Sequence, residues 1–209
     1  MTSDVGVIIG CGPSLTPEQI EMTRHLPQFG ANRAFQFDID VVLGCNWEFW
    51  DHYWPQIKDM RCDKWTTHPT LKEKRPEGLR WIEGRWEPGL STDPDYICYH
   101  HGSGPQILNL AFVRYNIRRF ILIGFDMRYP GKVTQSRYTG KRHFFGEDAL
   151  TQRHFPRTGP DGELTGLIDE MATIKPDAYG IEIYNCTLGS AMTCFPMMPL
   201  EQALEITAS

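Results

Sequence analysis

The sequence predicts an α/β fold: one doubly wound, mostly parallel, Rossmann-like sheet with helices on both faces. The first observation is Val5–Ile9, a short apolar run that stops at glycine, as buried parallel strands do. The second is Arg119–Gly124, Arg-Phe-Ile-Leu-Ile-Gly, which is the clearest strand of the chain. The third is Ser103–Tyr115, where apolar residues recur at helical spacing. Strands and helices that alternate in this way are typical of a sheet covered on both sides.

The remaining elements continue this alternation. Ser14 or Thr16 could cap a helix that runs to about Leu26, because Pro17 and Glu18 suit its first turn. The other predicted elements are a strand at Val41–Leu43, a helix at Trp47–Met60, a helix near Leu164–Thr173, a strand at Ile181–Tyr184 and a helix from Pro199.

Two segments do not fit the pattern. Lys72–Tyr99 is rich in Pro, Gly and Trp, and we expect a hairpin or irregular strands there. Met127–Gly162 has several glycines, many charges and no helical or strand period. A loop of this length inside a domain is usually functional or disordered. We therefore predict a single nucleotide-binding domain over residues 1–209, with a lid at about residues 127–162.

Composition excludes some classes of function. The net charge of −5 argues against broad, sequence-blind binding to nucleic acid. The six cysteines are scattered without a CxxC pair, which disfavours a zinc site and indicates reduced thiols. The first apolar run is far too short to span a membrane and lacks the features of a signal peptide, so we expect a cytoplasmic protein.

In doubly wound sheets, ligands bind beyond the carboxyl ends of the strands. Strand ends are predicted at Gly10–Ser14, Gly44–Asn46, His101–Gly104 and Gly124–Tyr129. Gly10 and Gly12 would let the backbone approach a phosphate, and a following helix would direct N–H groups at it. A tight strand-to-helix turn is an equally good interpretation, because Pro13 breaks the dinucleotide fingerprint and the Walker lysine is absent.

Gly10-Cys11-Gly12-Pro13-Ser14-Leu15 resembles the Gly-Asn-Gly-Pro-Ser-Leu opening of bacterial CMP-sialic acid-dependent sialyltransferases. Motility-accessory-factor glycosyltransferases, archaeal hydroxymethylpterin pyrophosphokinases and short phage proteins share this opening. Segments resembling other motifs of the family follow in the same order: Ala31–Phe35, Cys45–Asn46, Gly102–Gly104, Ile121–Asp126, Arg142–Gly146 and Tyr184–Met192. The chain departs from the family at Cys11, which replaces an asparagine that contacts the nucleotide, and it is shorter than the sialyltransferases.

The resemblance implies transfer of a sugar from a nucleotide-activated donor to a hydroxyl acceptor, without a metal or other cofactor. His143 then matches the general base, a role that suits imidazole at neutral pH. Tyr129 and Tyr138 match the two lid tyrosines that stabilise the leaving phosphate. His154, His100 and His101 are rival bases, and each of these side chains could also be an ordinary loop residue.

Donor binding is predicted at the strand ends. The predicted contacts are Gly10, Cys11, Gly12, Pro13, Ser14, Asn32, Asn46, Ser103, Gly104 and Asp126. Asn32 and Asn46 could contact a base or a ribose, although asparagine is common in turns without any ligand. Ser103 is either a helix N-cap or a ligand contact. Asp38-Ile39-Asp40 precedes a strand, so we interpret it as turn residues and not as a metal site. The tryptophans of Trp47–Trp54 are expected in the core.

The acceptor and the exact reaction stay open. A phage nucleic-acid hypermodification enzyme is one alternative, because Lys132, Arg137, Lys141, Arg142, Arg153 and Arg157 lie in the lid. An ATP-dependent pyrophosphokinase acting on a hydroxymethyl group is the second, with magnesium held by Asp126. A phage accessory protein that retains the fold without catalysis is the third. The sequence does not decide whether the protein is a homo-oligomer.

Overall fold

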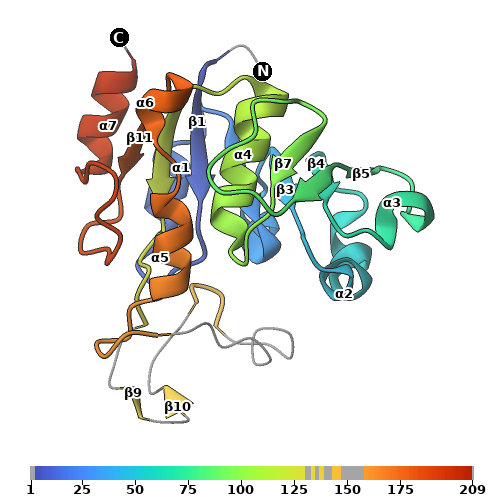
Figure 1. The fold of residues 1–209 in the computed structure, drawn as a ribbon, viewed down its shortest axis with the longest axis horizontal. Helices are drawn as coiled ribbons and strands as arrows, with labels where there is room; N and C mark the ends of the chain where they lie inside the picture. The colour runs from blue at the N-terminus through green and yellow to red at the C-terminus, as the bar shows by residue number, and fades with distance from the viewer. Residues whose placement is uncertain (1–2, 130–132, 135–136, 139–142, 147–157, 209) are drawn as a thin grey trace.

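The computed structural model of this chain describes residues 3–129, 133–134, 137–138, 143–146 and 158–208. Within these residues a seven-stranded sheet forms the centre of the molecule, in the order β11-β8-β1-β2-β3-β4-β5. Its strands are β1 (Val5–Ile9), β2 (Gln28–Ala31), β3 (Val41–Leu43), β4 (Asp63–Thr66), β5 (Leu79–Trp81), β8 (Arg119–Ile123) and β11 (Glu182–Asn185). All pairings in this sheet are parallel, as a doubly wound fold requires (Figure 1).

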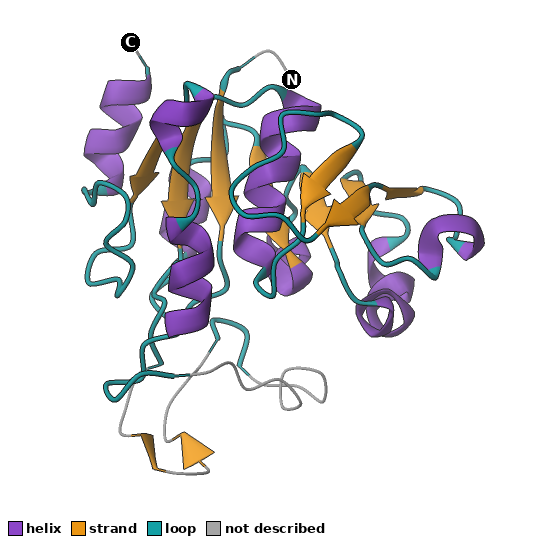
Figure 2. Cartoon of the chain, in the orientation of Figure 1, coloured by secondary structure: helices purple, strands orange, loops and turns teal. Residues whose placement is uncertain are grey.

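Helices cover both faces of the sheet (Figure 2). α4 (Ser103–Tyr115), α5 (Thr165–Ala172) and α6 (Pro176–Tyr179) lie on one face. The opposite core contains residues of α1 (Pro17–Met22), the 3-10 helix η1 (Asn32–Phe37), α2 (Trp47–Ile57) and α7 (Leu200–Thr207). The short helix α3 (Leu71–Lys74) lies near the β5 edge. The doubly wound, Rossmann-like arrangement that the sequence predicts is therefore confirmed.

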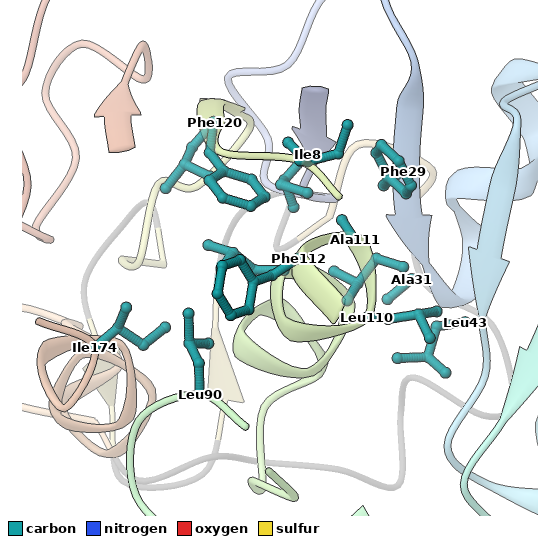
Figure 3. Packing of buried hydrophobic residues seen from close by; sticks show 14 of the residues in the cluster. Ile8, Phe29, Ala31, Leu43, Leu90, Leu110, Ala111, Phe112, Phe120 and Ile174 are labelled. Carbon is teal, nitrogen blue, oxygen red and sulfur yellow. The ribbon is translucent and has the colours of Figure 1, made fainter. Parts of the chain in front are cut away.

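The alternation of side chains along the central strands creates the two cores. In β8, Phe120 and Leu122 belong to the core under α4, while Ile121 and Ile123 belong to the core under α2 and α7. Figure 3 shows Leu110 and Ala111 of α4 near Ala31 of β2 and Leu43 of β3. Because both faces are covered, β8 is apolar throughout its buried length, which is why its run is so clear in the sequence.

The topological switch point lies between β1 and β8. The chain adds β2 to β5 in succession on one side of β1, then crosses the sheet to place β8 and β11 on the other side. β1 and β8 pair from Val5–Arg119 to Ile9–Ile123, so the turns that follow them begin side by side. Ligands of doubly wound folds bind in the crevice at this position.

Several element boundaries differ from the sequence-based predictions. α1 ends at Met22 and not near Leu26. Beyond it the chain forms tighter turns, in which the Arg24 N–H donates to the Glu21 carbonyl and the Leu26 N–H to the Thr23 carbonyl, before Pro27 leads into β2. α2 ends at Ile57, one turn before Met60. β11 begins and ends one residue later than predicted.

The segment Lys72–Tyr99 contains β5, β6 (Glu83–Arg85) and β7 (Tyr96–Cys98). β6 and β7 pair in parallel, so the hairpin alternative is wrong and the irregular-strand alternative is nearer. The predicted lid includes one antiparallel pair, β9 (Val133–Thr134) with β10 (Arg137–Tyr138), where the sequence shows no strand period. Much of that segment lies outside the described residues.

Candidate functional site

A cavity of about 180 Å³ opens at the switch point of the sheet. Its walls come from the turns after β1, β2 and β8, from the first residues of α4 and α5, and from His143. Among the predicted site residues, Gly10, Cys11, Gly12, Pro13, Asn32, Ser103, Gly104, Asp126, Tyr129 and His143 all line it. Segments far apart in the sequence therefore meet at the place where the fold predicts a ligand.

Gly10 and Gly12 are required by the contact between the β1 and β8 turns. A Cβ atom at Gly10 would lie 2.3 Å from the carbonyl oxygen of Gly124, and one at Gly12 would lie 1.9 Å from Asp126 Oδ2. The Gly10 N–H donates to the Ile123 carbonyl and the Gly12 N–H donates to the Gly124 carbonyl. These N–H groups are already used within the protein, so the packing explains the glycines without a phosphate.

α1 is also a poor phosphate anchor. It has six residues, and Thr16 and Gln19 form a reciprocal capping box at its start. The cavity wall contains no residue of α1. Ser14 likewise does not line this cavity but borders a second one, of about 280 Å³, near α1 and α7.

Asp126 joins the β8 turn to the β1 turn. Its carboxylate accepts hydrogen bonds from the Ser14 N–H at 3.2 Å and from the Ser14 hydroxyl at 2.9 Å. Burial raises the pKa of this carboxyl above its usual range, although the bonds from Ser14 act in the opposite direction. A carboxylate beside Gly12 would repel an anion there unless a cation lay between them.

Asn32 and Ser103 form a polar pair on the cavity wall. Asn32 adopts a left-handed backbone conformation with φ of 53°, which asparagine tolerates better than most residues. Its side-chain Nδ2 donates to Ser103 Oγ at 3.1 Å. Gly102, and not Ser103, occupies the N-cap of α4, which removes the N-cap interpretation of the serine.

The N-terminus of α4 presents backbone donors to the cavity. Ser103 and Gly104 are the first two residues of this 13-residue helix, and both line the wall. Within the described part of the chain, no acceptor is recorded for either N–H group. The first N–H groups of a helix lack intrahelical partners and carry the positive end of its dipole. This helix start can therefore hold an anion at Ser103 and Gly104, next to the Glu170 carboxylate, which already accepts the N–H group of the N-cap residue Gly102.

His143 reaches the cavity because its segment is anchored on the β1 turn. The Phe144 N–H donates to the Cys11 carbonyl at 2.8 Å. The Arg33 guanidinium donates to the carbonyls of Phe145 and Gly146, and the rings of Phe144 and Phe145 pack against Phe37. Arg33 and Phe37 belong to η1, so the residues after β2 also position this histidine.

Tyr129 is buried beside His143, with ring centroids 6.4 Å apart in an edge-to-face arrangement. Tyr138 belongs to β10, but its side chain is not among those described. Lys141, Arg142 and His154 lie outside the described residues, as do Lys132, Arg153 and Arg157 of the proposed basic cluster.

Other candidates lie away from the cavity or have structural partners. Asn46 is exposed at the start of α2 and does not line the cavity. Asp40 accepts the Gln28 N–H, so it supports the entry into β2. His100 is buried against the Gly89 carbonyl, and His101 pairs with Glu170.

The tryptophans and Cys11 behave as structural residues to different degrees. Trp50 is buried in the core as expected, but Trp47 is 46% exposed.

The Cys11 thiol contacts the Ala31 carbonyl, and burial raises its pKa to about 12. A thiol with so high a pKa stays protonated at neutral pH and is a poor nucleophile.

Several cavity residues are not among the site residues predicted from the sequence. Leu164 and Leu167, at the start of α5, supply an apolar wall. Arg128 supplies a positive charge and forms an ion pair with Glu163 at 3.5 Å. Its position next to Tyr129 is a signal that could have identified it. Met127, also in the wall, has φ of 50°, a strained value for a residue other than glycine or asparagine.

Among the described residues, no group of three or more His, Cys, Asp or Glu side chains is placed to hold a metal ion. No helix in the same residues has both the length and the apolar character needed to cross a bilayer.

The chain was also compared with models of protein families, with curated proteins and with solved structures. None of the three comparisons gives a match.

Proposed function

We propose that this protein transfers a sugar from a nucleotide-activated donor to a hydroxyl acceptor, with the reaction in the switch-point cavity. The observation that carries the proposal is the convergence of Cys11, Asn32, Ser103, Tyr129 and His143 on one cavity wall. They come from separate segments whose order along the chain resembles a glycosyltransferase superfamily.

The start of α4 is the best anchor for the donor phosphate. The N–H groups of Ser103 and Gly104 are suited to an anion, while those of Gly10 and Gly12 serve the sheet. Arg128 adds a positive charge to the same wall. The cavity is smaller than the roughly 300–1,000 Å³ of typical ligand pockets, so it would hold the reacting end of the donor and not the whole molecule.

His143 would take the proton of the acceptor hydroxyl as that oxygen attacks the anomeric carbon of the sugar. The nucleotide phosphate then leaves with the bonding electron pair, and its charge needs stabilisation. The Tyr129 hydroxyl and the start of α4 are suitable donors for that purpose. Neither group requires a metal ion.

Asp126 favours a second candidate function, pyrophosphoryl transfer from ATP. Magnesium in phosphoryl-transfer sites is commonly held by one or two carboxylates together with the substrate phosphates. Asp126 is a carboxylate in the cavity wall, near the turn where the sequence predicts a phosphate. The two functions differ in their metal requirement: activity that survives EDTA supports sugar transfer, and activity that EDTA abolishes supports the pyrophosphokinase.

Calorimetric titration of CMP, UDP, GDP and ATP, with and without magnesium, tests the nucleotide site. We expect one nucleotide to bind. The Ser103 hydroxyl accepts from Asn32 Nδ2 and can donate its own proton to the phosphate, in addition to the backbone N–H. Ser103→Ala keeps the N–H but removes the hydroxyl, so it and Asn32→Ala should each weaken binding about fivefold or more, as the loss of a hydrogen bond to a charged group does. Ser3→Ala is the matched control, because Ser3 bonds Val5 at the amino end of β1, opposite the cavity. If no nucleotide binds, or if Ser103→Ala binds as tightly as the unmodified protein, the proposal fails.

A further inference from the structure

An exposed aromatic group lies close to the cavity on the β6–β7 side of the molecule. Trp86 follows β6 and is 66% exposed, the largest exposure among the described large hydrophobic residues. Its ring meets Tyr99 edge-on, with centroids 4.5 Å apart, and lies 5.0 Å from the ring of His101. We call Trp86, Tyr99 and His101 the Trp86 shelf. Two neighbouring rings hold the indole in place while much of it stays open to solvent.

His101 has a defined orientation in this shelf. Its Nδ1 lies 2.8 Å from Glu170 Oε1, and the backbone N–H groups of His101 and Gly102 donate to the same carboxylate. An ionised carboxylate only accepts hydrogen bonds, so the proton of neutral His101 lies on Nδ1 and Nε2 is an acceptor. The imidazole is 79% exposed, and Nε2 has no recorded partner in the described part of the chain. The exposed indole thus offers a flat apolar face, and the inclined ring of His101 beside it offers an oriented hydrogen-bond acceptor.

Glu170 contacts both the Trp86 shelf and the segment that lines the cavity. Leu167 and Glu170 are three residues apart on α5, so they lie on one side of the helix about one turn apart. Both flank Gly102: a Cβ atom there would lie 2.9 Å from Leu167 and 3.2 Å from Glu170. Leu167 and Gly102 line the cavity, and His101 immediately precedes Gly102 in the chain. A ligand on the shelf would therefore be adjacent to the cavity wall.

The charges around the shelf indicate which ligand it suits. Glu83, Glu87, Asp93 and Asp95 lie on β6 and the connection to β7, where Arg85 is the one basic residue between Glu83 and Asp95. Arg85 is already paired with Glu83 and stacks on Tyr96. Arg114 of α4 donates to the Pro94 carbonyl and Lys72 lies near Glu83, so the carboxylates outnumber the basic groups but are partly balanced by them. An acidic surface of this kind disfavours the phosphates of a nucleic acid.

We propose that the Trp86 shelf binds the acceptor, and that this acceptor is an uncharged saccharide. The C–H face of a sugar ring would pack on the indole, and one hydroxyl would donate to His101 Nε2. The inference rests on the proposed sugar transfer for its role as an acceptor site. Saccharide binding to the shelf can nevertheless be measured without any nucleotide.

The test uses the indole N–H signals of the six tryptophans in an NMR titration. The probes are neutral methyl glycosides and disaccharides, with a single-stranded oligonucleotide as the charged comparison. Trp86→Phe assigns the signal of Trp86. We expect at least one saccharide to shift that signal, and Trp86→Ala to weaken its binding about tenfold. His101→Ala should weaken it by a smaller factor, because one hydrogen bond is lost and the indole remains.

Trp47→Ala is the matched control, since Trp47 is another exposed tryptophan, on α2. The Trp47→Ala variant should bind the saccharide as tightly as the unmodified protein does. The proposal is overturned if no saccharide shifts the Trp86 signal, if Trp86→Ala binds as well as the unmodified chain, or if the oligonucleotide binds the shelf in place of saccharides. If a saccharide binds but no nucleotide does, the proposed sugar transfer is wrong and the saccharide site stands. If a nucleotide binds but no saccharide shifts the Trp86 signal, only the proposal for the Trp86 shelf is wrong.

Discussion

His143 combines a titratable ring with a position in the cavity wall, beside Tyr129. If it is the general base, His143→Ala should lower turnover by about 10²–10⁴. Donor affinity should change little, because the base acts on the acceptor. Turnover assays and donor titration measure the two quantities separately, with the exposed His25→Ala as control. Near-normal turnover in His143→Ala would contradict the assignment, and His154 or His101 would then be the candidate base.

Gly12 is the residue for which the packing makes the sharpest stability prediction. A methyl group there meets both Asp126 and the Gly124 carbonyl, which is backbone and cannot rotate away. Gly12→Ala should therefore lower the free energy of unfolding by about 1–3 kcal/mol, as overpacking does. Chemical denaturation measures this change.

Gly166→Ala is the control for Gly12→Ala. Nothing lies within 4 Å of a Cβ atom at Gly166, which is exposed in α5, so alanine should leave stability equal or raise it. Equal stabilities of the two variants and the unmodified protein would show that the turns are less tightly packed than described.

At the scale of elements, the sequence predicts best the strands that are wholly apolar. β1, β3 and β8 were predicted from runs of Val, Ile, Leu and Phe, and α4 from its helical spacing. β2 and β4 were not predicted. β2 contains Gln28 and Gly30, and β4 contains Asp63 and Lys64, although Lys64 is buried. Lys64 donates to the carbonyls of Met60 and Cys62, and these hydrogen bonds offset the cost of burying its charged group. A local sequence pattern does not reveal such bonds.

The segment 127–162 carries a prediction of its own. If it closes over the donor, limited proteolysis within it should slow when the donor nucleotide is present, because closure protects its peptide bonds. Cleavage elsewhere in the chain, measured by mass spectrometry of the fragments, is the internal control. Equal cleavage of the segment with and without nucleotide would remove the lid hypothesis.

For the whole molecule, Asp126 links stability to pH. Its folded-state pKa is raised, so the folded state holds this proton more tightly than the unfolded chain does. Protonated Asp126 therefore contributes to the free energy of unfolding at low pH, and this contribution is lost as the pH rises through the raised pKa. Asp126→Asn should therefore raise the thermal midpoint at neutral pH, since an amide can still accept the Ser14 N–H.

The difference between Asp126→Asn and the unmodified protein should shrink as the pH falls towards the ordinary pKa of aspartate. Thermal unfolding across that pH range checks the trend. Asp63→Asn is the comparison variant, because Asp63 of β4 pairs with Arg80 of β5 and does not line the cavity. A lower midpoint for Asp126→Asn at neutral pH would contradict the sign of the effect.

The candidate site was predicted only in part from the sequence. Gly12, Ser103 and His143 were predicted because strand-end turns and short family-like segments mark them. The Glu170–His101 pair and the wall formed by Leu164 and Leu167 were not, because they depend on how α5 packs beside α4. Pairs such as Ser14 and Asp126 are separated by 112 positions, and no local signal specifies such a contact.

The pairing of β1 with β8 also constrains the order of events during synthesis. A chain emerging from the ribosome has β1 to β5 available well before residues 119–123 are made, so one edge of β1 stays open. An open apolar edge can pair with another chain. A fragment that stops before β8 should therefore aggregate. The cavity, whose wall needs the turn after β8, can form only after that late strand has docked.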